Sequence, residues 1–135
     1  MLFQIRRHQA LIIGVVFGLL LIFNARSQAA GVVAVCDEAS LDAALAGGGT
    51  VSFTCSGTIT LTATKVVGAN TIIDGAGQAV TISGGGAVSM FRVNPGVALT
   101  LRNLTIADGL NVGPVSQGGA IFNDAGTVTL NNSIL

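Results

Sequence analysis

Short stretches of alternating polar and apolar residues recur along the chain from about residue 51 onward. They lie at 51–54, 58–62, 80–83 and 98–101. Alternation of this kind is typical of β-strands, because successive side chains of a strand point to opposite faces. Glycine-rich bends separate the stretches, and each stretch is shorter than a usual hairpin strand. The pattern predicts a chain of short strands joined by tight bends.

One such unit repeats. The stretch 91–106 recurs 29 residues later, at 121–135. The shift aligns, without a gap, Val93 with Phe122, Asn94 with Asn123, Leu99 with Val128, Thr100 with Thr129, Leu101 with Leu130 and Asn103 with Asn132. Repetition at this period predicts an all-β solenoid, a right-handed parallel β-helix of about four coils. An antiparallel β-sandwich is the alternative, and the gap-free repeat argues against it.

Parallel ladders of equivalent strands predict a narrow apolar core inside the coils. The residues expected to point inward are Ile59, Leu61, Ile72, Ile82, Phe91, Val93, Leu99, Leu101, Leu104, Ile106, Ile121, Phe122, Val128 and Leu130. Asn103 and Asn132 are expected to stack at one bend. Asparagine tolerates unusual backbone angles there and can hydrogen-bond its equivalents along a ladder.

Residues 31–56 are expected to form an N-terminal cap. Leu41, Ala44 and Leu45 share one face of a predicted helix over about 38–46. Asp37 is a favourable N-cap residue, and the first strand follows at 51–54. A solenoid needs such a cap, because a bare terminal coil exposes its core and its unpaired strand edges.

The coils are predicted to occupy 57–135, and the sequence stops at Leu135 within a predicted strand. A terminal coil normally carries a polar or covered outer face. We therefore expect either the N-terminal piece of a longer protein or end-to-end association through the open C-terminal coil.

Residues 1–30 have the three regions of a secretory signal peptide. Arg6, Arg7 and His8 give a positive start, an apolar run extends over 10–23, and small residues precede a cleavage site after Ala29 or Ala30. The alternative is an uncleaved membrane anchor, for which the apolar run is short. We therefore expect a secreted or cell-surface protein that has no membrane partner once the signal is removed.

The two cysteines and the net charge restrict the kinds of site and partner that we expect. In an exported chain the two cysteines, Cys36 and Cys55, fit one structural disulfide, and two buried thiols are the alternative. Two thiols fall short of the usual ligand set of a metal site, so no metal is expected. Beyond residue 30 the chain has three basic residues and six acidic residues, hence a net charge of −3. Without a basic patch, nucleic acid is not an expected partner.

The segments 36–53, 70–77 and 101–106 together resemble the pectin-lyase-like superfamily of right-handed parallel β-helices. The likeness is greatest to bacterial secreted or surface members, the polymorphic outer-membrane-protein-like and adhesin-like chains, and extends over about 31–135. It implies this fold and an exported role. Pectate-lyase-like members use a calcium-binding aspartate cluster with a basic residue. Polygalacturonase-like members use aspartates on successive coils with a His and a Lys or Arg.

Neither pattern is present in this sequence. Asp74, Asp108 and Asp124 all lie in glycine-rich turns, where aspartate commonly bonds the local backbone. Catalysis and calcium binding are the alternatives for these carboxylates. Arg92 and Arg102 are expected in solvent, both able to face out from one coil, and the only histidine lies in the signal peptide.

These observations predict an exported structural or adhesive protein with no catalytic residues in this segment and no cofactor. Its outward Thr, Ser and Asn ladders are expected to contact carbohydrate or another cell surface. The alternative function is the N-terminal part of a polysaccharide lyase or glycoside hydrolase. That alternative rests on the resemblance alone, and one fold carries many functions.

Overall fold

The computed structural model describes residues 31–111, 113 and 118–135, so the predicted signal peptide at 1–30 lies outside the described residues. The helix and strands are, in chain order, β1 (Gly31–Val33), α2 (Glu38–Leu45), β2 (Gly49–Phe53), β3 (Gly57–Thr60), β4 (Lys65–Val67), β5 (Thr71–Asp74), β6 (Val80–Ser83), β7 (Phe91–Val93), β8 (Ala98–Arg102), β9 (Thr105–Ala107), β10 (Ile121–Asn123) and β11 (Thr127–Asn131).

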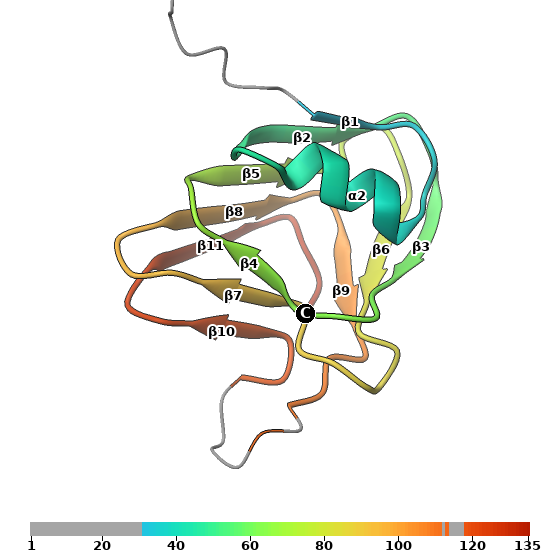
Figure 1. Cartoon of the computed structure of the whole chain (residues 1–135). Helices are drawn as coiled ribbons and strands as arrows, with labels where there is room; N and C mark the ends of the chain where they lie inside the picture. Colours follow the sequence, from blue (N-terminus) through green and yellow to red (C-terminus); the bar gives the residue numbers. More distant parts are fainter. Residues whose placement is uncertain (1–30, 112, 114–117) are drawn as a thin grey trace, which may run out of the picture.

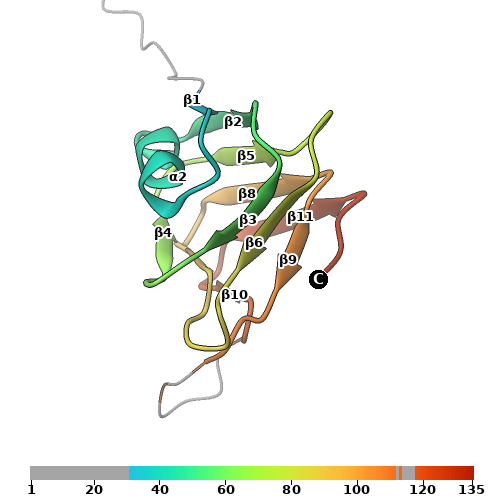
Figure 2. The same cartoon turned by 90° about the vertical axis from the view of Figure 1, so that its right-hand side faces the viewer.

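The strands coil into three parallel sheets around a common core (Figures 1 and 2). Sheet A has the order β1-β2-β5-β8-β11, sheet B has the order β3-β6-β9, and sheet C has the order β4-β7-β10. The predicted parallel β-helix is therefore confirmed. The stack makes about three turns, one fewer than expected. β1 adds one strand to sheet A at the capped end, and β11 with the Thr105–Ile134 bridge begins an incomplete turn at the other end.

The core lies on the axis of the coils and is built from one or two apolar residues per strand. Nine residues that the sequence places inside are buried, namely Ile59, Leu61, Ile82, Phe91, Val93, Leu99, Leu101, Leu104 and Ile106. Ile121 and Val128 stack on Phe91 and Leu99, and they are partly buried at the last coil. Leu130 stacks on Leu101 and stays 42% exposed.

Two predicted core positions are wrong. In β5 the inward residue is Ile73, not Ile72, because Ile73 is in register with the buried Val51 and Leu101 on either side. In β10 the inward residue is Ile121. Phe122 is in register with Arg92, whose side chain points outward on sheet C. Side-chain alternation then puts Phe122 outward as well.

The repeat also contains a gap that the alignment missed. Val93 pairs with Asn123 and not with Phe122, whereas Leu99 pairs with Val128 as predicted. The turn at 94–97 is one residue longer than the turn at 124–126. Each turn keeps one residue with a positive φ, Gly96 at 73° and Ala125 at 56°. The extra residue of the longer turn therefore lies before Gly96, the residue with the left-handed backbone.

The cap is built from α2 and β1. The Asp37 carboxylate accepts a hydrogen bond of 2.7 Å from the Ser40 N–H and so caps the helix. Leu41 of α2 is fully buried. The helix covers the end of the stack that β1 and β2 form. The predicted disulfide between Cys36 and Cys55 is confirmed, with an S–S distance of 2.03 Å.

Candidate functional site

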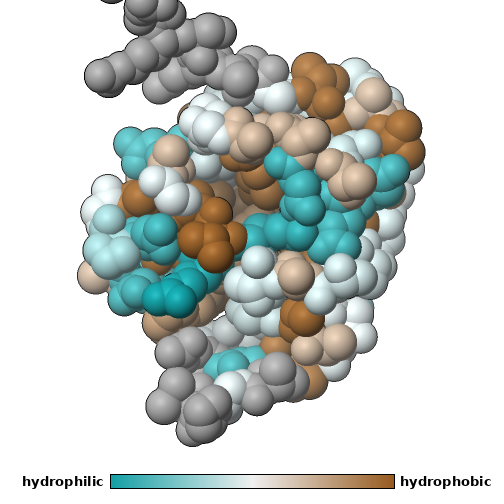
Figure 3. Space-filling model, in the orientation of Figure 1, coloured by the Kyte–Doolittle hydropathy of each residue, from teal (hydrophilic) through white to brown (hydrophobic). Residues whose placement is uncertain are grey.

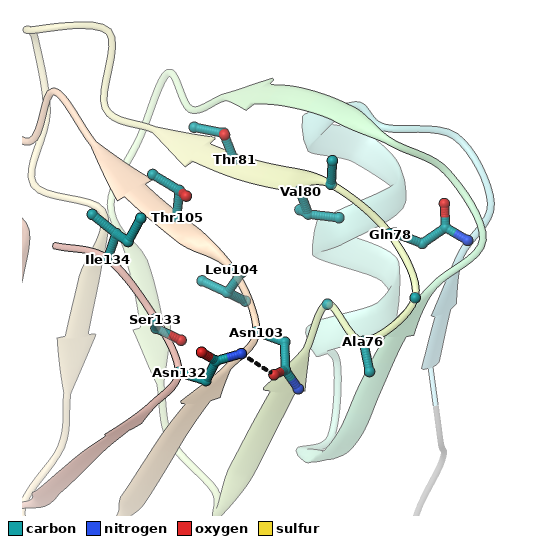
Figure 4. A pocket seen from close by; sticks show the side chains of 13 residues that line it. Ala76, Gln78, Val80, Thr81, Asn103, Leu104, Thr105, Asn132, Ser133 and Ile134 are labelled. Carbon is teal, nitrogen blue, oxygen red and sulfur yellow. Dashed lines mark hydrogen bonds between the residues drawn. The ribbon is translucent and has the colours of Figure 1, made fainter.

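An open groove of about 640 Å³ runs along the corner between sheets A and B (Figure 4). Its floor is the outer face of β6 and β9, and its walls are the loop before β6 and the ends of the last two coils. The lining residues are Gly75, Ala76, Gly77, Gln78, Ala79, Val80, Thr81, Asn103, Leu104, Thr105, Asn132, Ser133 and Ile134. None of these side chains carries a charge, so hydroxyl, amide and apolar groups define the chemistry of the groove.

A column of threonines marks the outer face of sheet B. Thr58, Thr81 and Thr105 occupy equivalent positions in β3, β6 and β9, and their neighbours on the inner face are buried isoleucines. Parallel strands place such residues about 4.8 Å apart. Figure 4 shows Thr81 and Thr105 on adjacent strands at the groove. The sheet therefore presents regularly spaced hydroxyl groups on a rigid backing.

The sheet A side of the groove carries a side-chain ladder. The Asn132 Nδ2 donates to Asn103 Oδ1 at 2.8 Å (Figure 4). The Asn103 Nδ2 in turn donates to Asp74 Oδ1 at 2.8 Å. Both asparagines have left-handed backbones, with φ of 54° and 48°. They lie at the bend that sequence analysis assigns to them. Asp74 continues the ladder by one coil, a role that was not predicted from the sequence.

Asp74 also fixes the direction of the ladder. Its carboxylate has only acceptor atoms, so the Asn103 amide must turn its NH₂ group toward Asp74. The same orientation leaves the Asn103 carbonyl oxygen to accept from Asn132. One carboxylate thereby sets which polar atoms the groove presents.

The opposite wall is the loop at 75–79. Gln78 Oε1 accepts a hydrogen bond of 2.8 Å from the Ser56 hydroxyl, and the same hydroxyl oxygen accepts from the Ala79 N–H at 3.1 Å. Gly75 packs so closely on the bend that a β-carbon there would lie 2.5 Å from the Asn103 carbonyl oxygen. The loop is therefore held against the coils on both sides.

The three aspartates that were candidates for catalysis or calcium binding do not form one cluster. Asp74 belongs to the ladder and also accepts a hydrogen bond from the Ala76 N–H at 3.0 Å. Asp108 follows β9 and accepts from the Ser83 hydroxyl at 3.2 Å. Asp124 follows β10 and forms an ion pair of 3.0 Å with Arg92. Each carboxylate bonds to its own surroundings.

The two arginines lie on different faces. Arg92 extends from sheet C, with its guanidinium carbon 5.5 Å from the centre of the Phe122 ring. Arg102 ends β8 on sheet A and is exposed. Both side chains are exposed, as expected, and a corner of the solenoid separates them.

A recess of about 310 Å³ lies on sheet C beside Arg92 and Phe122, with Val66 and Leu110 among its lining residues. Figure 3 shows a mixture of hydrophilic and hydrophobic areas on the face seen in that view. The positive charge of Arg92 beside this recess is already paired with the Asp124 carboxylate.

A charged cluster that was not predicted from the sequence lies between the cap and the first coil. Lys65 in β4 contacts Glu38 Oε1 at 2.6 Å and Asp42 Oδ1 at 2.8 Å. Hydrogen bonds from Lys65, and then from Thr62, lower the pKa of Glu38 to about 2. Burial acts to lower the pKa of Lys65, but the two carboxylates outweigh it and raise that pKa. The i, i+4 spacing of the acidic residues on α2 was the available signal.

Comparisons with other proteins assign no family, since the chain matches no family model, no curated protein and no solved structure. Among residues 31–111, 113 and 118–135, no three His, Cys, Asp or Glu side chains gather closely enough to hold a metal ion. Within the same residues, no helix is long and apolar enough to span a bilayer.

Proposed function

We propose that this protein is an exported, non-catalytic structural or adhesive β-helix that binds neutral carbohydrate in the groove between sheets A and B. The observation that carries the proposal is the uncharged polar lining of that groove. Hydroxyl and amide groups can both donate to and accept from sugar hydroxyls. The disulfide supports export, because such bonds persist in oxidising compartments.

The regular spacing of the polar side chains along the groove suits an extended polymer better than a small molecule. Thr81 and Thr105 repeat along the axis, and Asn103 and Asn132 repeat parallel to them. A ligand with repeated hydroxyl groups meets the same kind of contact on each coil. The groups are also fixed in advance by the backbone ladders and the side-chain ladder, which lowers the entropic cost of binding.

The resemblance to pectin-lyase-like proteins of bacterial surfaces supports the same proposal. It is also compatible with an enzymatic alternative. In that alternative this segment caps a polysaccharide lyase or glycoside hydrolase. The dispersed positions of Asp74, Asp108 and Asp124 favour the binding role for the described part of the chain. Acid–base cleavage of a glycoside uses two carboxyl groups held roughly 5 to 9.5 Å apart across the bond.

The test is calorimetric titration of the protein with neutral polysaccharides (a glucan, a galactan and a xylan) and with polygalacturonate. Thr81→Val and Thr105→Val remove the groove hydroxyls with little change in shape. Each lost hydrogen bond is worth about 0.5–1.5 kcal/mol, so the double variant should bind about 5- to 150-fold more weakly. Thr100→Val, on sheet A, is the matched control and should bind like the parent.

Two results would overturn the proposal. The first is a parent protein that binds none of the neutral polymers, or a double variant that binds as well as the control. The second is the appearance of new chain ends in any of the polysaccharides during incubation with the protein, which would support the enzymatic alternative.

A further inference from the structure

Asp74, the last residue of β5, is bonded to both walls of the groove between sheets A and B without lining it. Its Oδ1 accepts a hydrogen bond of 2.8 Å from the Nδ2 of Asn103, which belongs to the sheet A wall. The same oxygen accepts from the Ala76 N–H at 3.0 Å, and Ala76 belongs to the loop wall at 75–79. One oxygen atom therefore links the two walls.

The link joins two successive coils. Asp74 is in register with Arg102, the last residue of β8, and Asn103 follows directly. The Gly75 N–H donates to the Arg102 carbonyl at 2.9 Å, so the loop also has a backbone contact with this coil. On its other side the loop bonds to the Ser56 hydroxyl, which lies on the preceding coil. Asp74 thus provides the side-chain connection between the loop and the asparagines.

The position of the Asp74 oxygen also decides how Asn103 presents its amide. An amide NH₂ group has two hydrogens, and its carbonyl oxygen has two lone pairs. Asn103 uses one hydrogen toward Asp74 and one lone pair toward Asn132. It keeps one of each for a ligand, because its side chain lines the groove. Both ligand-binding atoms are therefore aimed by the bond to Asp74.

We propose that Asp74 is a positioning residue of the carbohydrate groove, which holds the loop wall and the asparagine ladder in their binding geometry. This inference rests on the proposed function. The role belongs to the oxygen atom and not to the negative charge, since both hydrogen bonds end on Oδ1. An asparagine at position 74 can accept both bonds with its own Oδ1, whereas an alanine can accept neither.

Calorimetric titration of the full chain with the neutral polysaccharide that the parent binds most tightly tests this role. Asp74→Ala should bind at least about fivefold more weakly, because the loop wall and Asn103 each lose the acceptor that fixes them. Asp74→Asn should bind within about twofold of the parent, because it keeps both bonds. Asp108→Ala is the matched control. Asp108 accepts from the Ser83 hydroxyl at another bend, outside the groove, so this variant should bind like the parent.

Nuclear magnetic resonance of the ligand-free protein measures the positioning directly. The side-chain NH₂ signals of Asn103 and Asn132 should shift in Asp74→Ala, and their hydrogens should exchange with solvent faster, because the ladder loses its first acceptor. The backbone N–H of Ala76 should also exchange faster. In Asp74→Asn these exchange rates should stay close to those of the parent. A general loss of stability would instead affect amides throughout the coils.

The outcomes separate this inference from the proposed function. A parent that binds no neutral polymer overturns the proposed function, and the role of Asp74 in binding with it. If the parent binds, three results overturn only the present inference. They are an Asp74→Ala variant that binds like the parent, an Asp74→Asn variant that binds as weakly as Asp74→Ala, and Asn103 and Asn132 signals that do not change in Asp74→Ala.

Discussion

Replacing Ile73 with alanine should destabilise the protein far more than the same change at Ile72, the preceding residue of β5. Ile73 is fully buried and stacks between Val51 in β2 and Leu101 in β8, which are also fully buried. Ile72 lies on the outer face of sheet A, in the row that contains Thr100. The two substitutions remove the same atoms from opposite sides of one strand.

The expected magnitude follows from the packing. Isoleucine to alanine deletes the equivalent of three methylene groups, so the transfer free energy lost at Ile73 is about 2.4 kcal/mol. A cavity adds to this cost, because hydrogen-bonded strands on both sides of β5 prevent Val51 and Leu101 from closing the space. We expect a total loss of about 3–4 kcal/mol, within the range found for such core truncations. At Ile72 the loss should stay within about 1 kcal/mol.

Urea denaturation followed by far-UV circular dichroism measures both variants against the parent. The midpoint should fall for Ile73→Ala with little change in the dependence of free energy on urea, since the surface exposed on unfolding is nearly the same. Equal losses at the two positions, or a larger loss for Ile72→Ala, would refute the assignment of Ile73 to the core and with it the register between β5 and its neighbours.

Three further outcomes are expected. Reduction of the disulfide should lower the free energy of unfolding by about 3 kcal/mol, because it frees a loop of about 20 residues in the unfolded chain, and thermal unfolding with and without reductant measures this. Glu38 has a lowered pKa in the folded state, chiefly through its hydrogen bond from Lys65. Its stabilising contribution is therefore complete above its ordinary pKa of about 4.5 and is lost as the pH falls toward 2. Stability measured from pH 7 to pH 2 should fall less steeply for Glu38→Gln, and an unchanged acid limb would contradict the role of the pair. Gly84→Ala should destabilise markedly, because its β-carbon would lie 2.4 Å from the Val88 carbonyl oxygen and 2.7 Å from that of Asp108. Gly77→Ala, also in a turn but with open space around its β-carbon, is the comparison, although its φ of 78° carries a strain of its own.

The class of fold, the capping helix and the disulfide could all be predicted from the sequence. The strand alternation and the Asp37 N-cap are local signals that act over a few residues. The two cysteines allow only one pairing within the chain. Asn103 and Asn132 were placed at a bend from a local signal too, since their left-handed conformation is a local property.

Where the local pattern is ambiguous, the face of a strand that turns inward depends on pairing with strands of neighbouring coils. Both Ile72 and Ile73 are apolar, and the choice between them comes from the register with Val51 and Leu101. Phe122 was misplaced because the turn before β8 has an extra residue, and a change of one residue reverses inward and outward.

The groove and the charged cluster also required the folded chain. Thr81 and Thr105 become neighbours only when successive coils stack, and Asp74 joins the asparagine ladder across a whole coil. Lys65 reaches Glu38 because the cap helix folds back over the first turn. In a solenoid, residues one coil apart in sequence lie about 4.8 Å apart in space. The length of every intervening turn therefore decides which side chains meet.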